Sequence, residues 1–178
     1  MTERIHAINP RCRVSIVEEF LTPENVAGLL AERFDYVVDA IDSARAKTAL
    51  IAHCHRQRIS LVCVGVGAAG GQTDPGRVQL TNLARTTEDP LLSKVRARLR
   101  REHGFPREHG KKLGVDCVYS TEPLTYPSAE GGVCYERPED AHLNGLNCAG
   151  FGSSVCGTAT FGLRAAAQVL NKTAARIA

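Results

Sequence analysis

The segment from Asp35 to Gln72 constrains the fold more than any other part of the chain. It begins with a nearly all-apolar run that ends at Ile41, passes through Asp42 and Ser43 into a helical pattern over 44–57, and returns to an apolar run over 60–66 that enters a cluster of glycines. An apolar run of this kind is typical of a parallel strand that is covered on both faces. The order of strand, helix and strand therefore predicts an open α/β sheet, whose ligands bind outside the carboxyl ends of its strands.

The flanking segments extend this pattern into a layered parallel sheet. Residues 13–20 alternate as a strand does, and Thr22-Pro23 is a helix start that leads to about Arg33. We therefore expect the order βαβαβ, which is the pattern of a parallel layered sheet. Further elements are expected as a short helix over 1–9, strands over 77–84 and 117–126, a helix over 91–103, a mobile loop over 128–147 and a helix from near Phe151 to the end.

Composition excludes several classes of protein. The chain has 22 Lys and Arg against 19 Asp and Glu, and a net charge of +3 does not by itself establish a nucleic-acid partner. Seven cysteines without a C-x-x-C pair indicate reduced thiols in the cytosol rather than a disulfide framework. No apolar run approaches the roughly 18 residues of a transmembrane helix, so we expect no membrane span and a cytoplasmic location.

Asp39 and Asp42 follow the first buried strand and form the first candidate site. Because side chains alternate along a strand, positions three apart cannot share a face, so one of the two carboxylates must lie past the strand end. A carboxylate there can hold a magnesium ion beside phosphates. The alternative is that Asp42 or Ser43 only caps the next helix. Lys47, one turn into that helix, either reaches a phosphate or faces solvent.

The glycine-rich segment VGVGAAGGQTDPGR and the helix that follows it are two further candidates. The glycines allow backbone amides to approach an anion, but the spacing matches neither a P-loop nor a dinucleotide fingerprint, and a plain crossover is the alternative. Residues 86–112 carry eight Lys and Arg against four Asp and Glu, a density that suits either RNA phosphates or an ordinary solvated face. The predicted RNA contacts are Lys94, Arg96, Arg98, Arg100 and Arg101.

Cys148 is the candidate nucleophile, because it stands between a polar loop and the start of the last helix. A helix N-terminus lowers the pKa of a thiol and favours the thiolate. The alternative is a small buried thiol with no chemical role. Cys134, in the preceding loop, is a weaker second candidate.

At these residues the chain resembles a known family. The segments DYVVDAIDSARAKTALIAHC, GGQTDPGRVQL, DPLLSKVRARLR, KLGVDCVYSTEPL and NCAGFGSSVCGTATFG follow one another as they do in the bacterial tRNA threonylcarbamoyladenosine dehydratases. That family is a branch of the ubiquitin-activating, ThiF/MoeB-like adenylating superfamily. The resemblance covers nearly all 178 residues, and the segments around Cys117 and Cys148 are specific to this branch.

The resemblance implies a Rossmann-like ATP-binding sheet, a homodimer, and ATP-dependent cyclisation of threonylcarbamoyladenosine beside the tRNA anticodon. The side-chain carboxylate of the modification would be activated by adenylation and then captured by its own carbamoyl group. The implied cofactors are ATP and Mg²⁺, and a cysteine desulfurase or sulfur acceptor is a possible partner. Asp42 corresponds to the aspartate that faces magnesium and ATP, with Asp39 and Lys47 beside it, and Cys148 to the branch cysteine.

The chain also departs from the family. Members begin with a strand, a GxGGxGS loop and a helix, none of which occurs here, so the resemblance implies the carboxyl-terminal two-thirds of the enzyme, with the amino-terminal nucleotide-binding half missing. Residues 1–71 would be what remains of the adenylation domain, and 72–178 its carboxyl-terminal part. We expect little ATP–pyrophosphate exchange from such a chain alone. The alternative function is a non-catalytic module that dimerises or holds tRNA or a sulfur-transfer partner.

Overall fold

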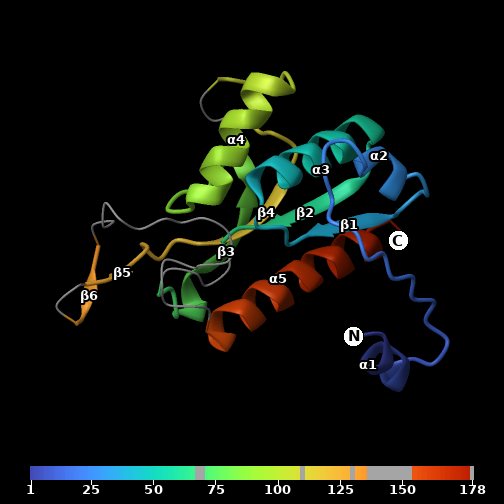
Figure 1. Cartoon of the computed structure of the whole chain (residues 1–178), viewed down its shortest axis with the longest axis horizontal. Helices are drawn as coiled ribbons and strands as arrows, with labels where there is room; N and C mark the ends of the chain where they lie inside the picture. Colours follow the sequence, from blue (N-terminus) through green and yellow to red (C-terminus); the bar gives the residue numbers. More distant parts are fainter. Residues whose placement is uncertain (67–70, 109–110, 129–130, 136–153, 177–178) are drawn as a thin grey trace.

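A four-stranded sheet forms the centre of the molecule (Figure 1). The computed structural model describes residues 1–66, 71–108, 111–128, 131–135 and 154–176. The strands, in the spatial order β1-β2-β4-β3, are β1 (Tyr36–Asp39), β2 (Ser60–Val64), β4 (Asp116–Ser120) and β3 (Val78–Asn82). The first three run parallel, whereas β3 pairs antiparallel with β4 and forms one edge.

Helices cover both faces of this sheet, so the fold has three layers. Figure 1 shows α3 (Ala44–Gln57) and α4 (Pro90–Glu102) on one face and α5 (Val155–Ala174) on the other. The smaller elements are α1 (Thr2–Ile8), α2 (Val26–Leu29), the 3-10 turns η1 (Pro75–Arg77) and η2 (Leu83–Arg85), and a hairpin of β5 (Tyr126–Pro127) and β6 (Val133–Cys134). No helix among the described residues has the length and apolarity needed to cross a bilayer.

The side chains of β2 alternate between the two layers, as a doubly covered strand requires. Leu61 and Cys63 belong to the larger hydrophobic cluster, with α3 and α4, whereas Val62 packs in a second cluster with Phe161 and Ala165 of α5. The strand predicted to be buried on both faces was the run over 35–41, and for β1 this prediction is wrong, because Val38 is 52% exposed. β2 is the strand that is covered on both faces.

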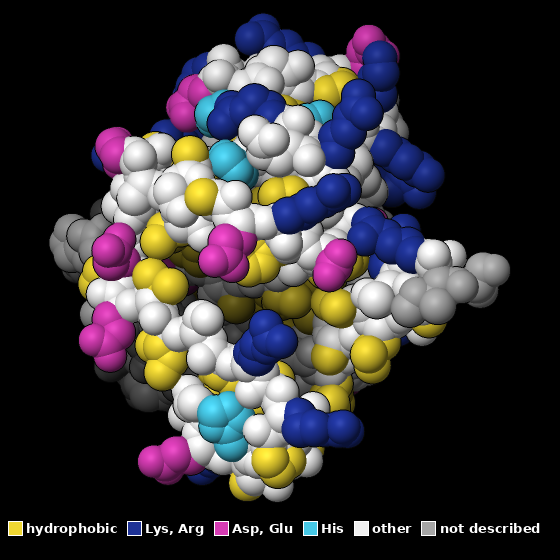
Figure 2. Space-filling view, turned by 90° about the vertical axis from the view of Figure 1, so that its right-hand side faces the viewer, with side chains coloured by type: hydrophobic (Ala, Val, Ile, Leu, Met, Phe, Trp, Pro, Cys, Tyr) yellow, Lys and Arg dark blue, Asp and Glu magenta, His cyan; other side chains and the backbone are white. Residues whose placement is uncertain are grey.

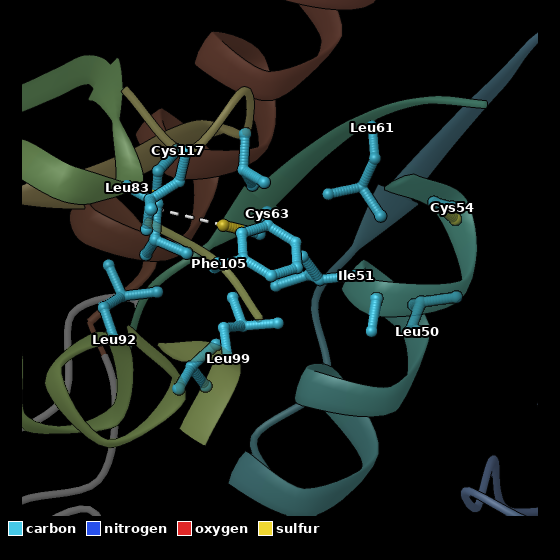
Figure 3. Packing of buried hydrophobic residues seen from close by; sticks show 14 of the residues in the cluster. Leu50, Ile51, Cys54, Leu61, Cys63, Leu83, Leu92, Leu99, Phe105 and Cys117 are labelled. Atoms are coloured by element: carbon cyan, nitrogen blue, oxygen red, sulfur yellow. Dashed lines mark hydrogen bonds between the residues drawn. The ribbon is translucent and has the colours of Figure 1, made fainter. Parts of the chain in front are cut away.

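The larger cluster is the main core of the molecule. Figure 3 shows Leu50, Ile51 and Cys54 of α3 facing the strands, with Leu92 and Leu99 of α4 in the same cluster. At its centre Cys63 and Cys117 are register partners on β2 and β4, with 3.2 Å between their sulfur atoms, and both are free thiols. Because β2 pairs with β4, strands from residues 1–71 and from residues 72–178 belong to one sheet.

Several predicted elements differ from the structure. The strand expected over 117–126 ends at Ser120, and the loop expected over 128–147 contains β6. The expected strand over 13–20 is wrong: the described residues there form no β ladder, and Ile16, Val17 and Phe20 are exposed. Alternating side chains favour a strand, but a strand also needs a partner, and no described strand lies beside this segment. The helix expected over 22–33 is reduced to α2, although the Thr22 hydroxyl does accept hydrogen bonds from the Glu24 and Asn25 amides.

Candidate functional site at the carboxyl edge of the sheet

A buried ion pair lies where β1 passes into α3. Asp39, the last residue of β1, and Lys47, in the first turns of α3, both have side chains with 0 % exposure, and 2.9 Å separates Lys47 Nζ from Asp39 Oδ2. The ammonium group also donates to the Asp39 carbonyl oxygen at 3.3 Å, and Asp39 Oδ1 accepts from the Ile41 amide at 2.9 Å. Burial raises the pKa of Asp39, whereas the charge of Lys47 opposes that shift. The pair therefore fixes the strand end against the helix.

Asp42 lies three residues after Asp39 and has a different environment. Its side chain is exposed, and it makes no hydrogen bond or ion pair within the described residues. The cap of α3 is Ser43, whose hydroxyl accepts from the Ala46 amide at 3.4 Å. The capping role that the sequence left open thus belongs to Ser43, and the Asp42 carboxylate is available to a ligand.

Asp89 connects the next strand end to α4. Its Oδ1 accepts from the Leu92 amide at 2.8 Å, which caps α4, and its Oδ2 accepts from the Val66 amide at 2.8 Å. A Cβ on Gly65 would lie 2.1 Å from that same Oδ2, so only glycine fits at position 65. Burial raises the pKa of Asp89, and the two amide hydrogen bonds and the charge of Lys47 oppose the shift.

Glu122 holds the far side of the glycine-rich segment. Its carboxylate accepts from the Thr73 and Asp74 amides, both at 3.0 Å, and its carbonyl oxygen accepts from the Gln72 side chain. The two family-like segments GGQTDPGRVQL and KLGVDCVYSTE therefore meet here, next to the antiparallel pairing of β3 and β4. Residues 67–70 of the glycine segment lie outside the described residues.

The carboxylates at this edge suit a magnesium ion that is bound together with phosphates. They do not suit a magnesium ion that is held by protein side chains alone. No group of three or more His, Cys, Asp or Glu among the described residues could hold a metal ion. Mg²⁺ usually keeps several waters and is bound through one or two carboxylates together with substrate phosphates. One exposed carboxylate, Asp42, at the carboxyl edge of a parallel sheet meets that requirement, whereas Asp39 is already bound to Lys47.

The five predicted RNA contacts on α4 differ in their exposure and in whether their side chains already have partners. Arg96 donates to the Leu83 and Thr86 carbonyl oxygens and to the Thr86 hydroxyl, so it has a structural role beneath the helix. Arg100 donates to the Pro106 carbonyl oxygen. Arg98 and Arg101 both pair with Glu102, at 3.0 and 2.6 Å, and Lys94 is exposed.

The predicted nucleophile cannot be placed. Cys148 lies outside the described residues, as does most of the loop expected over 128–147. Cys134 is described, in β6, where its thiol is half-buried and contacts the Tyr126 carbonyl oxygen at 3.5 Å.

Sequence reasoning missed two residues of this edge. Asp89 stands directly before Pro90, where an aspartate is typical of a helix cap, but nothing in the sequence signals its second hydrogen bond, to Val66. The role of Glu122 depends on a contact across about 49 positions of sequence, which no local pattern records. Gly65 did belong to the predicted glycine cluster.

Comparison with known proteins gives one consistent family. The sequence profile of the ThiF family matches residues 1–170. A protein of Escherichia coli K12, tRNA threonylcarbamoyladenosine dehydratase, is 48% identical over 179 residues that cover 100% of this chain and 66% of that protein. The protein of the same name from Haemophilus influenzae is 42% identical over 173 residues, which cover 97% of this chain and 63% of that protein.

Solved structures give the same result. The chain matches TcdA (CsdL) with a TM-score of 0.85 and 46% identity, over 99% of this chain and 64% of that one. It matches the E. coli enzyme in complex with ATP with a TM-score of 0.81 and 45% identity, over 99% and 63%. These matches confirm the Rossmann-like α/β class. The chain spans a little under two thirds of the length of these relatives.

Proposed function

The chain belongs to the ThiF family, and from this premise we propose that it acts in the ATP-dependent dehydration of threonylcarbamoyladenosine in tRNA. The relatives from E. coli and H. influenzae carry the name of that activity, at 48% and 42% identity. The observation that carries the proposal for this chain is the carboxyl edge of its sheet. There a free carboxylate, Asp42, stands above a rigid, fully buried ion pair.

The reaction has two steps in this proposal. In the first, a carboxylate oxygen of the modified nucleoside attacks the α-phosphorus of ATP, and pyrophosphate leaves. In the second, the carbamoyl group of the same modification attacks the activated carboxyl carbon, and AMP leaves with one of the original carboxylate oxygens. The ring that forms is lighter than the substrate by one water. Solved structures of the E. coli relative contain ATP and AMP, which are the nucleotide consumed and the nucleotide released in this proposal.

The residues of this chain hold the reactants in place. Asp42 would bind the magnesium ion that accompanies ATP, and that ion neutralises phosphate charge when it is bound. Asp39 and Lys47 position Asp42 by fixing the turn between β1 and α3. Asp89 holds the Val66 amide, and so the entry into the glycine segment, against α4. The two steps above need no thiol nucleophile, and Cys148, the candidate from the sequence, lies outside the described residues.

The partners follow from the substrate. We propose tRNA as the substrate, with Lys94, Arg98 and Arg101 as its contacts on α4. Lys94 and Arg101 are exposed and Arg98 is partly exposed, whereas Arg96 and Arg100 are bound to backbone oxygens. A homodimer, a sulfur-transfer partner and a cytoplasmic location remain predictions from the family.

The test is pyrophosphate exchange that depends on modified tRNA. We expect the protein isolated from its own cells to exchange labelled pyrophosphate into ATP only when tRNA with threonylcarbamoyladenosine is present. Exchange that is equal with unmodified tRNA would contradict the proposal, because the attacking carboxylate is then absent.

A further inference from the structure

A cavity lies at the amino ends of the parallel strands, on the side of the sheet opposite to the carboxyl edge described above. It has a volume of about 480 Å³ and opens where β1, β2 and β4 begin, between the end of α3 and the end of α5. Its floor includes Ile51, Leu61 and Val115, which also belong to the core. We call it the amino-edge cleft and define it by its polar lining, which includes Tyr36, Arg58, Asn82, Lys112, Asp116 and Lys172.

The charges of the amino-edge cleft are unbalanced. Three cations, Arg58, Lys112 and Lys172, line it against one carboxylate, Asp116. That carboxylate is already satisfied, because Asp116 Oδ2 accepts from Gln168 at 2.6 Å and lies 3.9 Å from Lys172 Nζ. Within the described residues neither Arg58 nor Lys112 makes a side-chain hydrogen bond or ion pair.

The surface around the amino-edge cleft also carries positively charged side chains. It is the side of the molecule on which α5 ends, and Figure 2 shows Lys and Arg side chains gathered along one side of it. The arginines of α4 differ, since four of them have backbone or Glu102 partners. Arg58 and Lys112 are thus two cations of the cleft that no described side chain neutralises.

Arg58 stands in a conformation that usually belongs to glycine. It ends α3 with φ of 56° and ψ of 31°, in the left-handed region, and its amide bonds back to the carbonyl oxygens of the last turn. Glycine is the common residue at such a helix end because it has no Cβ. The chain carries an arginine there instead, and that arginine lines the cleft. Backbone strain kept at a charged side chain is a reason to test it for function.

We propose that the amino-edge cleft binds phosphate groups of an RNA backbone, and this inference rests on the proposed tRNA substrate. The five residues of β2 separate the cleft from the carboxyl edge by roughly 17 Å at about 3.3 Å per residue. A single nucleotide bound at Asp42 cannot reach that far, whereas a polymer with regularly spaced phosphates contacts both edges. The cations of the lining suit phosphates. The rings of the lining are His55, which packs against Phe105, and the half-buried Tyr36.

The experiment measures RNA affinity against salt concentration for the full chain, with a tRNA and with an unrelated RNA stem–loop. The test variant is Arg58→Gly with Lys112→Gln. Glycine relieves the backbone strain at position 58, so the variant is expected to fold. The matched control is Arg56→Gln with Arg107→Gln, which removes the same charge from exposed positions that have no described side-chain partner and lie outside the lining.

Each lost phosphate contact lowers the slope of log K against log salt by about 0.7 to 0.9. We therefore expect the test variant to lose roughly 1.4 to 1.8 from the slope for both RNAs, and the control to keep the slope of the original chain. Equal slopes for test and control, or an original chain that binds neither RNA, overturn the inference. Pyrophosphate binding that is lost in the test variant while RNA binding is kept also overturns it, in favour of a free-phosphate site. If the slope falls as expected but no tRNA is dehydrated, the proposed function fails and the cleft stands.

Discussion

Asp39 and Lys47 have no access to solvent, and their pairing is the chemical difference between the two aspartates of the β1–α3 turn. Asp42, three residues after Asp39, has no partner in the described structure and faces outward. One carboxylate thus supports the turn and the other is free for chemistry. The buried pair holds the turn, and the turn determines where Asp42 lies.

Removal of one member of the pair has a large predicted effect on stability. In Lys47→Met the buried Asp39 carboxylate loses its counterion, so we expect the free energy of unfolding to fall by about 3 to 5 kcal/mol. Chemical denaturation followed by circular dichroism measures it. Asp39→Leu combined with Lys47→Met should recover most of the loss, because no uncompensated charge remains. A double variant as unstable as the single one would contradict this account of the pair.

Asp42 is predicted to act on magnesium and ATP rather than on stability. Asp42→Asn should leave the unfolding free energy within about 0.5 kcal/mol, because the side chain is exposed and does not cap α3. In the protein isolated from its own cells, it should lower magnesium-dependent ATP turnover by roughly 100-fold or more, on the scale of lost electrostatic groups in active sites. Asp35→Asn is the matched control, since Asp35 is an exposed aspartate before the start of β1. Equal turnover in the two variants would count against Asp42.

At the scale of elements, the end of β2 and the start of α4 are joined by Asp89. The Asp89 carboxylate caps α4 and also accepts a hydrogen bond from the Val66 amide. It occupies the position that a Cβ at residue 65 would take. The helix and the glycine segment therefore cannot move independently near the carboxyl edge.

Gly65→Ala tests this connection. The added methyl group would lie 2.1 Å from Asp89 Oδ2, so the carboxylate must leave at least one of its two amides. We expect a loss of about 2 kcal/mol or more in thermal or chemical denaturation, because a buried amide loses its partner. Gly28→Ala is the control, since its added methyl group meets nothing within 4 Å and helix propensity favours alanine. Equal stabilities of the two variants would show that Asp89 does not restrict position 65.

The outer face of α4 carries its own prediction. Arg98→Glu with Arg101→Glu should weaken tRNA binding and flatten its salt dependence, because one partly exposed and one exposed cation are reversed beside Glu102. Filter binding at several salt concentrations measures the slope. Thermal denaturation of the same variant provides the control for folding. A salt slope equal to that of the original chain would remove α4 from the RNA interface.

The sequence predicted those elements whose signal is local. The apolar run of β2, the helical pattern of α3 and the Asp-Pro start of α4 each appear within a residue or two of their predicted place. The strand expected over 13–20 failed because alternation describes one strand and not its neighbour. The pairing of Lys47 with Asp39 could not be predicted either. The pairing depends on how tightly the turn between β1 and α3 folds back, and the sequence separation of Asp39 and Lys47 does not determine that.

At the scale of the whole molecule, the sheet separates two kinds of surface. Acidic and glycine residues lie at the carboxyl edge. Three cations line the amino-edge cleft, and two of them, Arg58 and Lys112, have no side-chain partner within the described residues. The layers between them hold three buried thiols, Cys54, Cys63 and Cys117, inside the main core. The packing that connects the two edges therefore also governs thiol reactivity.

Thiol labelling of the native protein tests that packing. Burial raises the pKa of Cys54 to about 11 and raises the pKa of Cys117 well above its usual range, so both stay protonated at pH 8. We expect iodoacetamide at pH 8 to modify Cys156, which is exposed, and to spare Cys54, Cys63 and Cys117 until the chain unfolds. Peptide mapping by mass spectrometry identifies the sites. Labelling of Cys63 as fast as that of Cys156 would contradict the packing described.

The most direct test of the central claim is the mass of the modified nucleoside. Transfer RNA with threonylcarbamoyladenosine would be incubated with ATP, Mg²⁺ and the protein isolated from its own cells, and its nucleosides then analysed by mass spectrometry. The account predicts a nucleoside lighter by one water, with one AMP released for each ring formed, and neither product from the Asp42→Asn protein. An unchanged nucleoside mass with the unaltered protein would contradict it.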